Sequence, residues 1–146
     1  VRSMEFAMSP CVLHGVGKPG FTLGDDEIEV GMGIHGEPGV ERTNMKSAKE
    51  IAKILVDKIL ADYDFTDSEV ALMINGLGGS PLMELYIIEN DVRNYLDEKG
   101  IKVYRTYVGN FMTSLEMMGC SVSLLKLDDE LKTLLDVPCS TPALKQ

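Results

Sequence analysis

The residues best suited to chemistry stand in one glycine-rich segment, residues 33–39, with the sequence GIHGEPG. Its histidine, His35, has an imidazole that can act as a nucleophile or as an acid and base near neutral pH. The neighbouring glycines have no Cβ, so the backbone there can approach a ligand closely or adopt a positive φ. The only other histidine, His14, has no such neighbours, and we interpret it as an exposed loop residue. We therefore predict that His35 is the catalytic residue of this chain.

Two neighbours of His35, Gly36 and Glu37, are the candidates for binding a substrate. The Glu37 carboxylate can accept a hydrogen bond from Nδ1–H of the imidazole and leave Nε2 free to attack or to accept a proton. Backbone N–H groups of the glycine-rich turn can stabilise an oxygen that becomes negatively charged. The alternative is a structural turn histidine whose ring nitrogens are both hydrogen-bonded. The surrounding glycines favour the chemical interpretation.

A second glycine-rich turn, residues 75–81 (NGLGGSP), follows a predicted strand and precedes a predicted helix. Backbone N–H groups at such a turn can bind an anion. The alternative is a tight strand-to-helix connection, because the segment lacks the ending of a Walker loop. We expect Ser80 to cap the helix, with Pro81 as its first residue. Farther along, Thr113 or Ser114 is expected to cap a helical turn, either as a structural cap or in contact with a ligand.

Composition and charge exclude several classes of protein. The chain has 146 residues, of which 45% are hydrophobic and 25% charged, which suits one globular domain with its own core. A net charge of −9 argues against a nucleic-acid partner and against an anionic membrane surface. No apolar run approaches the roughly 20 residues that span a bilayer, and no signal-peptide pattern opens the sequence. The three cysteines form no metal-binding or disulfide pattern, so we expect no metal and a reducing cytoplasm.

Hydrophobic periodicity predicts an α/β domain with a mixed sheet. Strands are expected over residues 4–8, 27–34, 69–74, 101–109 and 121–127. Helices are expected over residues 47–63, 82–99 and 130–135, and the segment 137–146 is expected to be irregular. Ser47 and Glu50 form a capping box at the start of the first helix. The glycine-rich turns follow strands, which places their functional groups at one end of the sheet.

Taken together, several segments of the chain resemble the dihydroxyacetone (glycerone) kinase family, in particular the second, C-terminal lobe of its substrate-binding subunit. The segments are residues 9–11 (SPC), 17–19 (GKP), 27–39 (EIEVGMGIHGEPG), 75–86 (NGLGGSPLMELY), 99–114 (KGIKVYRTYVGNFMTS) and 124–134 (LLKLDDELKTL). This resemblance implies that residues 1–146 form a single two-layer domain with helices mainly on one face of the sheet. It also implies that His35 binds dihydroxyacetone covalently, its Nε2 adding to the ketone carbon to give a hemiaminal.

The resemblance further implies a cytoplasmic, homodimeric kinase of glycerol metabolism that converts dihydroxyacetone to dihydroxyacetone phosphate. An acid–base pair would come from the first lobe, so the isolated lobe is expected to be inactive and to bind dihydroxyacetone weakly or not at all. No cofactor is expected in this chain. ADP or ATP with magnesium would lie on a nucleotide-binding subunit of a phosphotransferase-linked system or on a fused domain. The alternative is a paralogue that senses dihydroxyacetone and acts as a transcriptional coactivator without kinase activity.

Overall fold

The computed structural model describes residues 1–33 and 37–146, and in them a six-stranded sheet is accompanied by three helices. The strands are β1 (Arg2–Ala7), β2 (Glu27–Val30), β3 (Glu41–Asn44), β4 (Glu69–Gly76), β5 (Lys102–Gly109) and β6 (Gly119–Leu127). The helices are α1 (Ala48–Asp62), α2 (Leu82–Glu98) and α3 (Asp129–Leu135). The order across the sheet is β3-β2-β1-β6-β4-β5. Only β4 and β5 pair in parallel among these strands, so the mixed sheet is confirmed.

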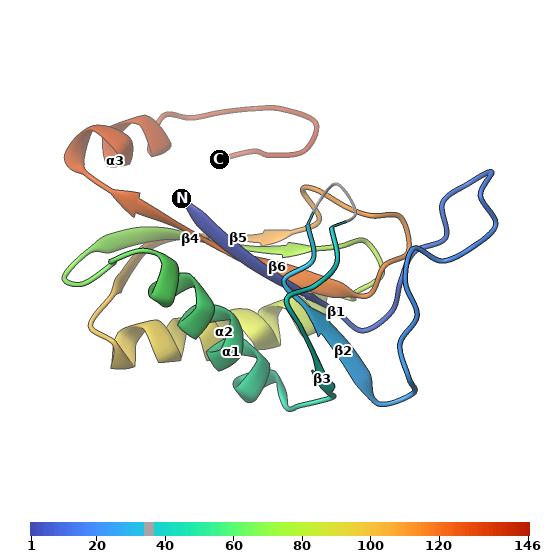
Figure 1. Ribbon diagram of the computed structural model, residues 1–146. Helices are drawn as coiled ribbons and strands as arrows, with labels where there is room; N and C mark the ends of the chain where they lie inside the picture. The colour runs from blue at the N-terminus through green and yellow to red at the C-terminus, as the bar shows by residue number, and fades with distance from the viewer. Residues whose placement is uncertain (34–36) are drawn as a thin grey trace.

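The two long helices cover one face of the sheet. Helices α1 and α2 pack on each other, α1 also on β1 and α2 on β4 and β5, whereas α3 and the C-terminal tail lie on the other side (Figure 1). The prediction of helices mainly on one face is therefore confirmed. Alternation along each strand then separates apolar residues, which meet the helices, from residues that point to the opposite face.

Helix α1 forms as its sequence predicts. Ser47 is the N-cap residue, and it exchanges hydrogen bonds with Glu50 in a complete capping box. The apolar stripe packs into the core through Ile51, Leu55 and Ile59, each almost fully buried. The local signals and the tertiary packing agree here, which is why the helix boundaries fall within a residue of those expected.

Helix α2 differs from expectation at its start. Its N-cap is Pro81, and no side chain caps the helix. Ser80 instead donates its hydroxyl to the carbonyl of Gly119, at 3.0 Å, and accepts the amide of the same residue, at 2.8 Å. The predicted capping role of Ser80 is wrong because this buried hydroxyl joins the turn to β6. At the other end, Gly100 has φ +74° and ends the helix as predicted.

The hairpin formed by β2 and β3 also departs from the expected strands. β2 ends at Val30, four residues earlier than predicted, because Gly31 takes φ +75° and turns the chain away from the sheet. β3 returns beside β2 at the edge of the sheet and was not expected. Its residues, ERTN, are mostly exposed and have no apolar alternation, so hydrophobic periodicity cannot detect them. The loop that joins these strands contains the segment 33–39.

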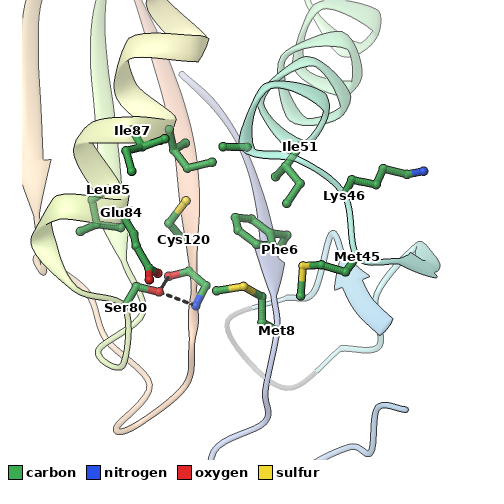
Figure 2. Close-up of a pocket in the computed structure, with 13 residues that line it drawn as sticks. Phe6, Met8, Met45, Lys46, Ile51, Ser80, Glu84, Leu85, Ile87 and Cys120 are labelled. Carbon is green, nitrogen blue, oxygen red and sulfur yellow. Dashed lines mark hydrogen bonds between the residues drawn. The ribbon is translucent and has the colours of Figure 1, made fainter. Parts of the chain in front are cut away.

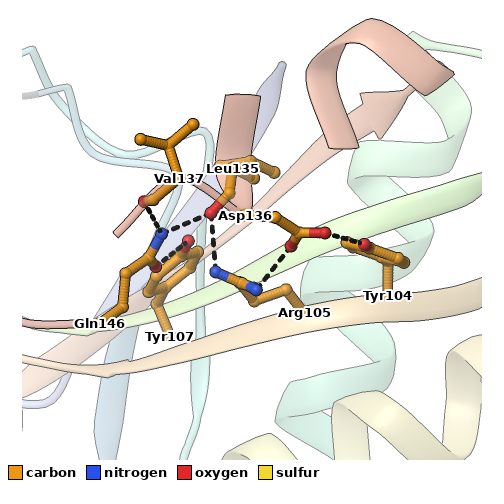
Figure 3. Close-up of polar contacts among 7 residues, drawn as sticks. All are labelled: Tyr104, Arg105, Tyr107, Leu135, Asp136, Val137 and Gln146. Atoms are coloured by element: carbon orange, nitrogen blue, oxygen red, sulfur yellow. Dashed lines mark hydrogen bonds and ion pairs between the residues drawn. The ribbon is translucent and has the colours of Figure 1, made fainter. Parts of the chain in front are cut away.

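A group of polar contacts holds the C-terminal tail against β5 (Figure 3). Arg105 donates to the carbonyl of Leu135, at 2.7 Å, and pairs with Asp136, whose carboxylate also accepts the hydroxyl of Tyr104. Gln146 donates to the carbonyl of Val137 at 3.1 Å. These contacts attach α3 and the tail to the sheet at its edge strand, β5.

Candidate active site

A cavity of about 650 Å³ lies on the face of the sheet that α1 and α2 leave open. Its floor consists of residues from four strands, Glu5 of β1, Glu29 of β2, Asn75 of β4 and Ser121 of β6. The residues beside them in sequence, such as Phe6 and Val30, belong to the core beneath the helices. Its walls come from three loops, residues 8–26, 31–40 and 110–118. The strand order, with β6 between β1 and β4, brings these distant segments together.

The loop 31–40 supplies one wall of the cavity. Gly33, Glu37, Pro38 and Gly39 line it, so both described limbs of the predicted catalytic segment face this space. Residues 34–36 lie outside the described residues, and with them the predicted catalytic His35 and its neighbour Gly36. Glu37 is described and lines the cavity, where its carbonyl accepts the amide of Gly33 at 3.1 Å.

The other predicted histidine behaves as expected. His14 is exposed in the loop between β1 and β2, and it does not line this cavity. The three cysteines, Cys11, Cys120 and Cys139, are free thiols. Among the residues that the structure describes, no three histidine, cysteine, aspartate or glutamate side chains gather in a way that could hold a metal ion. In the same described part of the chain, no helix has the length and apolar character needed to cross a membrane.

Sequence analysis missed an ion pair between Glu29 and Arg42 at the base of loop 31–40. Glu29 Oε2 accepts the Nε–H of Arg42 at 2.8 Å, and Oε1 accepts the amide of Gly39 at 3.1 Å. Both side chains line the cavity. The two residues stand directly opposite each other in the β2–β3 register. Opposite charges that face each other across two strands favour a hairpin. The sequence shows the two charges but not their pairing, so β3 could not be identified from them.

Asn75 fixes the third wall, the loop 110–118. Its side-chain oxygen accepts the amides of Phe111 and Met112, both at 2.8 Å, and its side-chain nitrogen donates to the carbonyl of Met112, also at 2.8 Å. The side chain is buried, with 3% of its surface exposed. This side-chain amide therefore fixes the start of the loop at Phe111 and Met112.

The second glycine-rich turn is a structural connection and not an anion site. The amide of Leu77 donates to the carbonyl of Gly119, at 3.1 Å, and that of Gly79 donates to the carbonyl of Met117, at 2.8 Å. Gly78 has φ +122°, and a Cβ there would lie 1.9 Å from the carbonyl oxygen of Leu115. The turn thus donates to and packs against the loop 110–118, which leaves these N–H groups unavailable to an anion.

Thr113 and Ser114 were expected to cap a helical turn, and this prediction is wrong because no helix begins in the described residues 110–118. Both residues do line the cavity, so the alternative of ligand contact is geometrically open to them. The hydroxyl of Ser114 lies 3.2 Å from the thiol sulfur of Cys11, which lines the same space.

The cavity is acidic among its described lining residues. Glu5, Glu29 and Glu37 contribute carboxylates, and Arg42 contributes a guanidinium that is paired with Glu29. Burial raises the pKa of the Glu5 carboxyl, and the negative charge of Glu37 raises it further. Such an environment suits a small uncharged molecule that offers hydroxyl donors to these carboxylates.

A second cavity, of about 180 Å³, lies on the helix side between the starts of α1 and α2 (Figure 2). Phe6, Met8, Met45 and Ile51 give it apolar walls, and the side chain of Lys46 extends away from it. Glu37, the one predicted substrate-binding residue that the structure describes, does not line it. The larger cavity, on the open face, is therefore the candidate active site.

This arrangement is a two-layer α/β domain with a cavity of small-molecule size on its open sheet face, lined by both polar and apolar side chains. Comparison with known proteins identifies the family: a family model described as "Dak1 domain" matches residues 1–143. The chain belongs to the Dak1 domain family.

The chain is 47% identical over 131 residues to the "PTS-dependent dihydroxyacetone kinase 1, dihydroxyacetone-binding subunit DhaK" of Listeria innocua, a match that covers 89% of this chain and 40% of the relative. Among solved structures, the "Dihydroxyacetone kinase operon co-activator Dha-DhaQ" superposes with a TM-score of 0.84 at 36% identity, covering 93% of this chain and 43% of the other. The dihydroxyacetone kinase of C. freundii in complex with AMP-PNP and Mg2+ superposes with a TM-score of 0.72 at 25% identity, covering 99% and 29%. The chain therefore spans less than half the length of these relatives.

Proposed function

We propose that this chain is the C-terminal lobe of the dihydroxyacetone-binding subunit of a dihydroxyacetone kinase, and that it captures dihydroxyacetone through His35. The supporting observation is the cavity itself: the described limbs of the loop that carries His35 line a cavity with three carboxylates, in a domain 47% identical to a dihydroxyacetone-binding subunit. The imidazole Nε2 adds to the ketone carbon as the carbon–oxygen π bond opens. The oxygen takes up one proton and Nδ1 of the ring gives one up, so a neutral hemiaminal forms. A covalent bond holds a three-carbon ligand that offers few other contacts.

The described groups of the cavity suit the rest of that small ligand. Dihydroxyacetone carries two hydroxyl groups, and carboxylates are hydrogen-bond acceptors for hydroxyls. Glu5 and Glu37 are the acceptors that we assign to them. We retain Glu37 as the residue that orients the imidazole of His35, and Gly36 as a backbone contact to the ligand.

The phosphoryl donor would come from elsewhere in the enzyme. We propose that ADP or ATP with magnesium is bound by a separate nucleotide-binding subunit or a fused domain, as the AMP-PNP and Mg2+ complex of the C. freundii kinase suggests. The whole enzyme would be cytoplasmic and homodimeric, and the product would be dihydroxyacetone phosphate.

Covalent capture can be tested on the complete subunit by NMR with [2-¹³C]dihydroxyacetone, because the isolated lobe is expected to bind the ligand weakly or not at all. The carbonyl resonance should be joined by that of a tetrahedral carbon bonded to an imidazole nitrogen. His35→Ala should abolish this signal, and the matched control His14→Ala should retain it. Absence of the signal in the wild-type subunit, or its persistence in His35→Ala, would refute capture by His35.

A second candidate function is that of a coactivator, which is favoured by the TM-score of 0.84 with the Dha-DhaQ co-activator. Both functions use His35, so adduct formation does not separate them. A phosphoryl-transfer assay on the complete subunit with its nucleotide-binding partner does. Formation of dihydroxyacetone phosphate supports the kinase, whereas adduct formation without transfer supports the coactivator.

A further inference from the structure

The loop 31–40 is attached to the sheet at a narrow base built around one carboxylate, that of Glu29. Only 9% of this side chain is exposed. One of its oxygens accepts the Nε–H of Arg42 on β3, and the other accepts the amide of Gly39 at the returning end of the loop. A single buried group thus joins the departing strand, the returning strand and the loop between them.

Close packing at Gly39 strengthens this attachment. A Cβ at this position would lie 2.6 Å from Glu29 Cγ and 2.8 Å from the carbonyl oxygen of Val30. The backbone of Gly39 therefore rests directly on the Glu29 side chain, which only glycine allows. The other limb is held where the amide of Gly31 donates to the carbonyl of Glu5 at 2.7 Å.

Stability alone does not account for this ion pair, in which the Glu29 side chain is buried but that of Arg42 is 44% exposed. Taking the Glu29 carboxylate out of water offsets much of its attraction to Arg42, so such a pair adds little net stability. Hydrogen bonds that involve a charged group are, however, short and strongly directional. A carboxylate that accepts from both Arg42 and Gly39 fixes the direction in which the loop leaves the sheet, which an apolar contact does not.

We infer that Glu29 and Arg42 are positioning residues for His35: their ion pair holds the base of loop 31–40 so that the imidazole is presented to the ketone. This inference rests on the proposed function. The two side chains act through Gly39 and not on the substrate, so their loss should reduce adduct formation without abolishing ligand entry to the cavity.

The test compares the ¹³C hemiaminal signal in Glu29→Gln, Arg42→Gln and the double variant. Glu29→Gln keeps the shape of the side chain and removes its charge, which should lower the adduct equilibrium about tenfold, as expected for loss of one charge-assisted hydrogen bond. Arg42→Gln should have a similar effect. The double variant should be little worse than either single variant, because the two residues act as one unit.

Glu27→Gln is the matched control, because Glu27 lies on the same strand, accepts the amide of Gly24 and does not line the cavity. Circular dichroism at the temperature of the NMR experiment confirms that each variant is folded, and Arg42, the more exposed partner, supplies a second variant if Glu29→Gln is not. The inference is overturned if the wild type forms the adduct and Glu29→Gln, Arg42→Gln and Glu27→Gln all form equal amounts of it. That outcome would leave the proposed function intact. A complete wild-type subunit without adduct would overturn the proposed function itself.

Discussion

Replacing Asn75 by alanine should release the loop 110–118 and destabilise the whole domain. The substitution removes three hydrogen bonds of 2.8 Å, two accepted from the amides of Phe111 and Met112 and one donated to the carbonyl of Met112. At about 1 kcal/mol net for each hydrogen bond, the loss is about 3 kcal/mol. For a domain of this size, about 2–4 °C per kcal/mol converts this loss to a fall in Tm of about 6–12 °C.

Two measurements check this estimate. Differential scanning calorimetry gives the change in Tm, and amide hydrogen exchange followed by NMR reports whether Phe111 and Met112 lose protection in the native state. Asn90→Ala is the matched control, because Asn90 is an exposed residue of α2. Protected amides at both positions, together with a Tm change no larger than that of the control, would show that the loop holds its place without this side chain.

Three further predictions concern other parts of the fold. Gly78→Ala should lower the free energy of unfolding by about 3 kcal/mol or more, because the new Cβ would lie 1.9 Å from the carbonyl oxygen of Leu115 and because φ is +122°. Thermal unfolding measures this loss, and a value below that expected for backbone strain alone would contradict the contact. Burial raises the pKa of Glu5, so the fold loses stability as the pH rises through that pKa and the carboxyl ionises. Glu5→Gln should therefore raise Tm near neutral pH, and this gain should vanish in acid, which a pH series of melting curves checks. Burial raises the pKa of the Cys120 thiol to about 12, so a thiol reagent should modify the partly exposed Cys139 in the native chain and reach Cys120 only on unfolding.

The elements with strong local signals could be predicted from the sequence. The start of α1 is determined by the capping box of Ser47 and Glu50, and its buried face by the apolar stripe that follows in the same segment. The strand β4 could be predicted for a similar reason, since a short apolar run without helical spacing is typical of a buried strand. In both cases the residues that determine the element are close together in the chain.

The parts that could not be predicted depend on partners that are distant in sequence. β3 forms by pairing with β2 along all four of its residues, and nothing in those four residues alone indicates a strand. Ser80 has the residue type and position of a helix cap, yet its hydroxyl bonds to Gly119, 39 residues away. The sequence does not show that Gly119, rather than the start of α2, is the hydrogen-bond partner of this hydroxyl.

The candidate site, too, could be predicted from the sequence only in part. The glycine-rich segment 33–39 could be identified from its composition, and its described ends do line the cavity. The floor could not, because Glu5, Asn75 and Ser121 become neighbours only when β6 inserts between β1 and β4. Each of these residues is an ordinary polar position in its own strand, and only the strand order makes them a site.

The core is what holds the floor of the cavity in place. Along β2, Ile28 and Val30 are almost fully buried beneath the helices, and Glu29 between them must therefore point to the open face. Burying an aliphatic side chain of this size stabilises the fold by about 1.5–3 kcal/mol. A shift of the strand by one residue would expose both and bury Glu29 against the helices, so the register that the core selects is also the register that the site needs. The geometry of the cavity is thus stabilised by residues that never contact its contents.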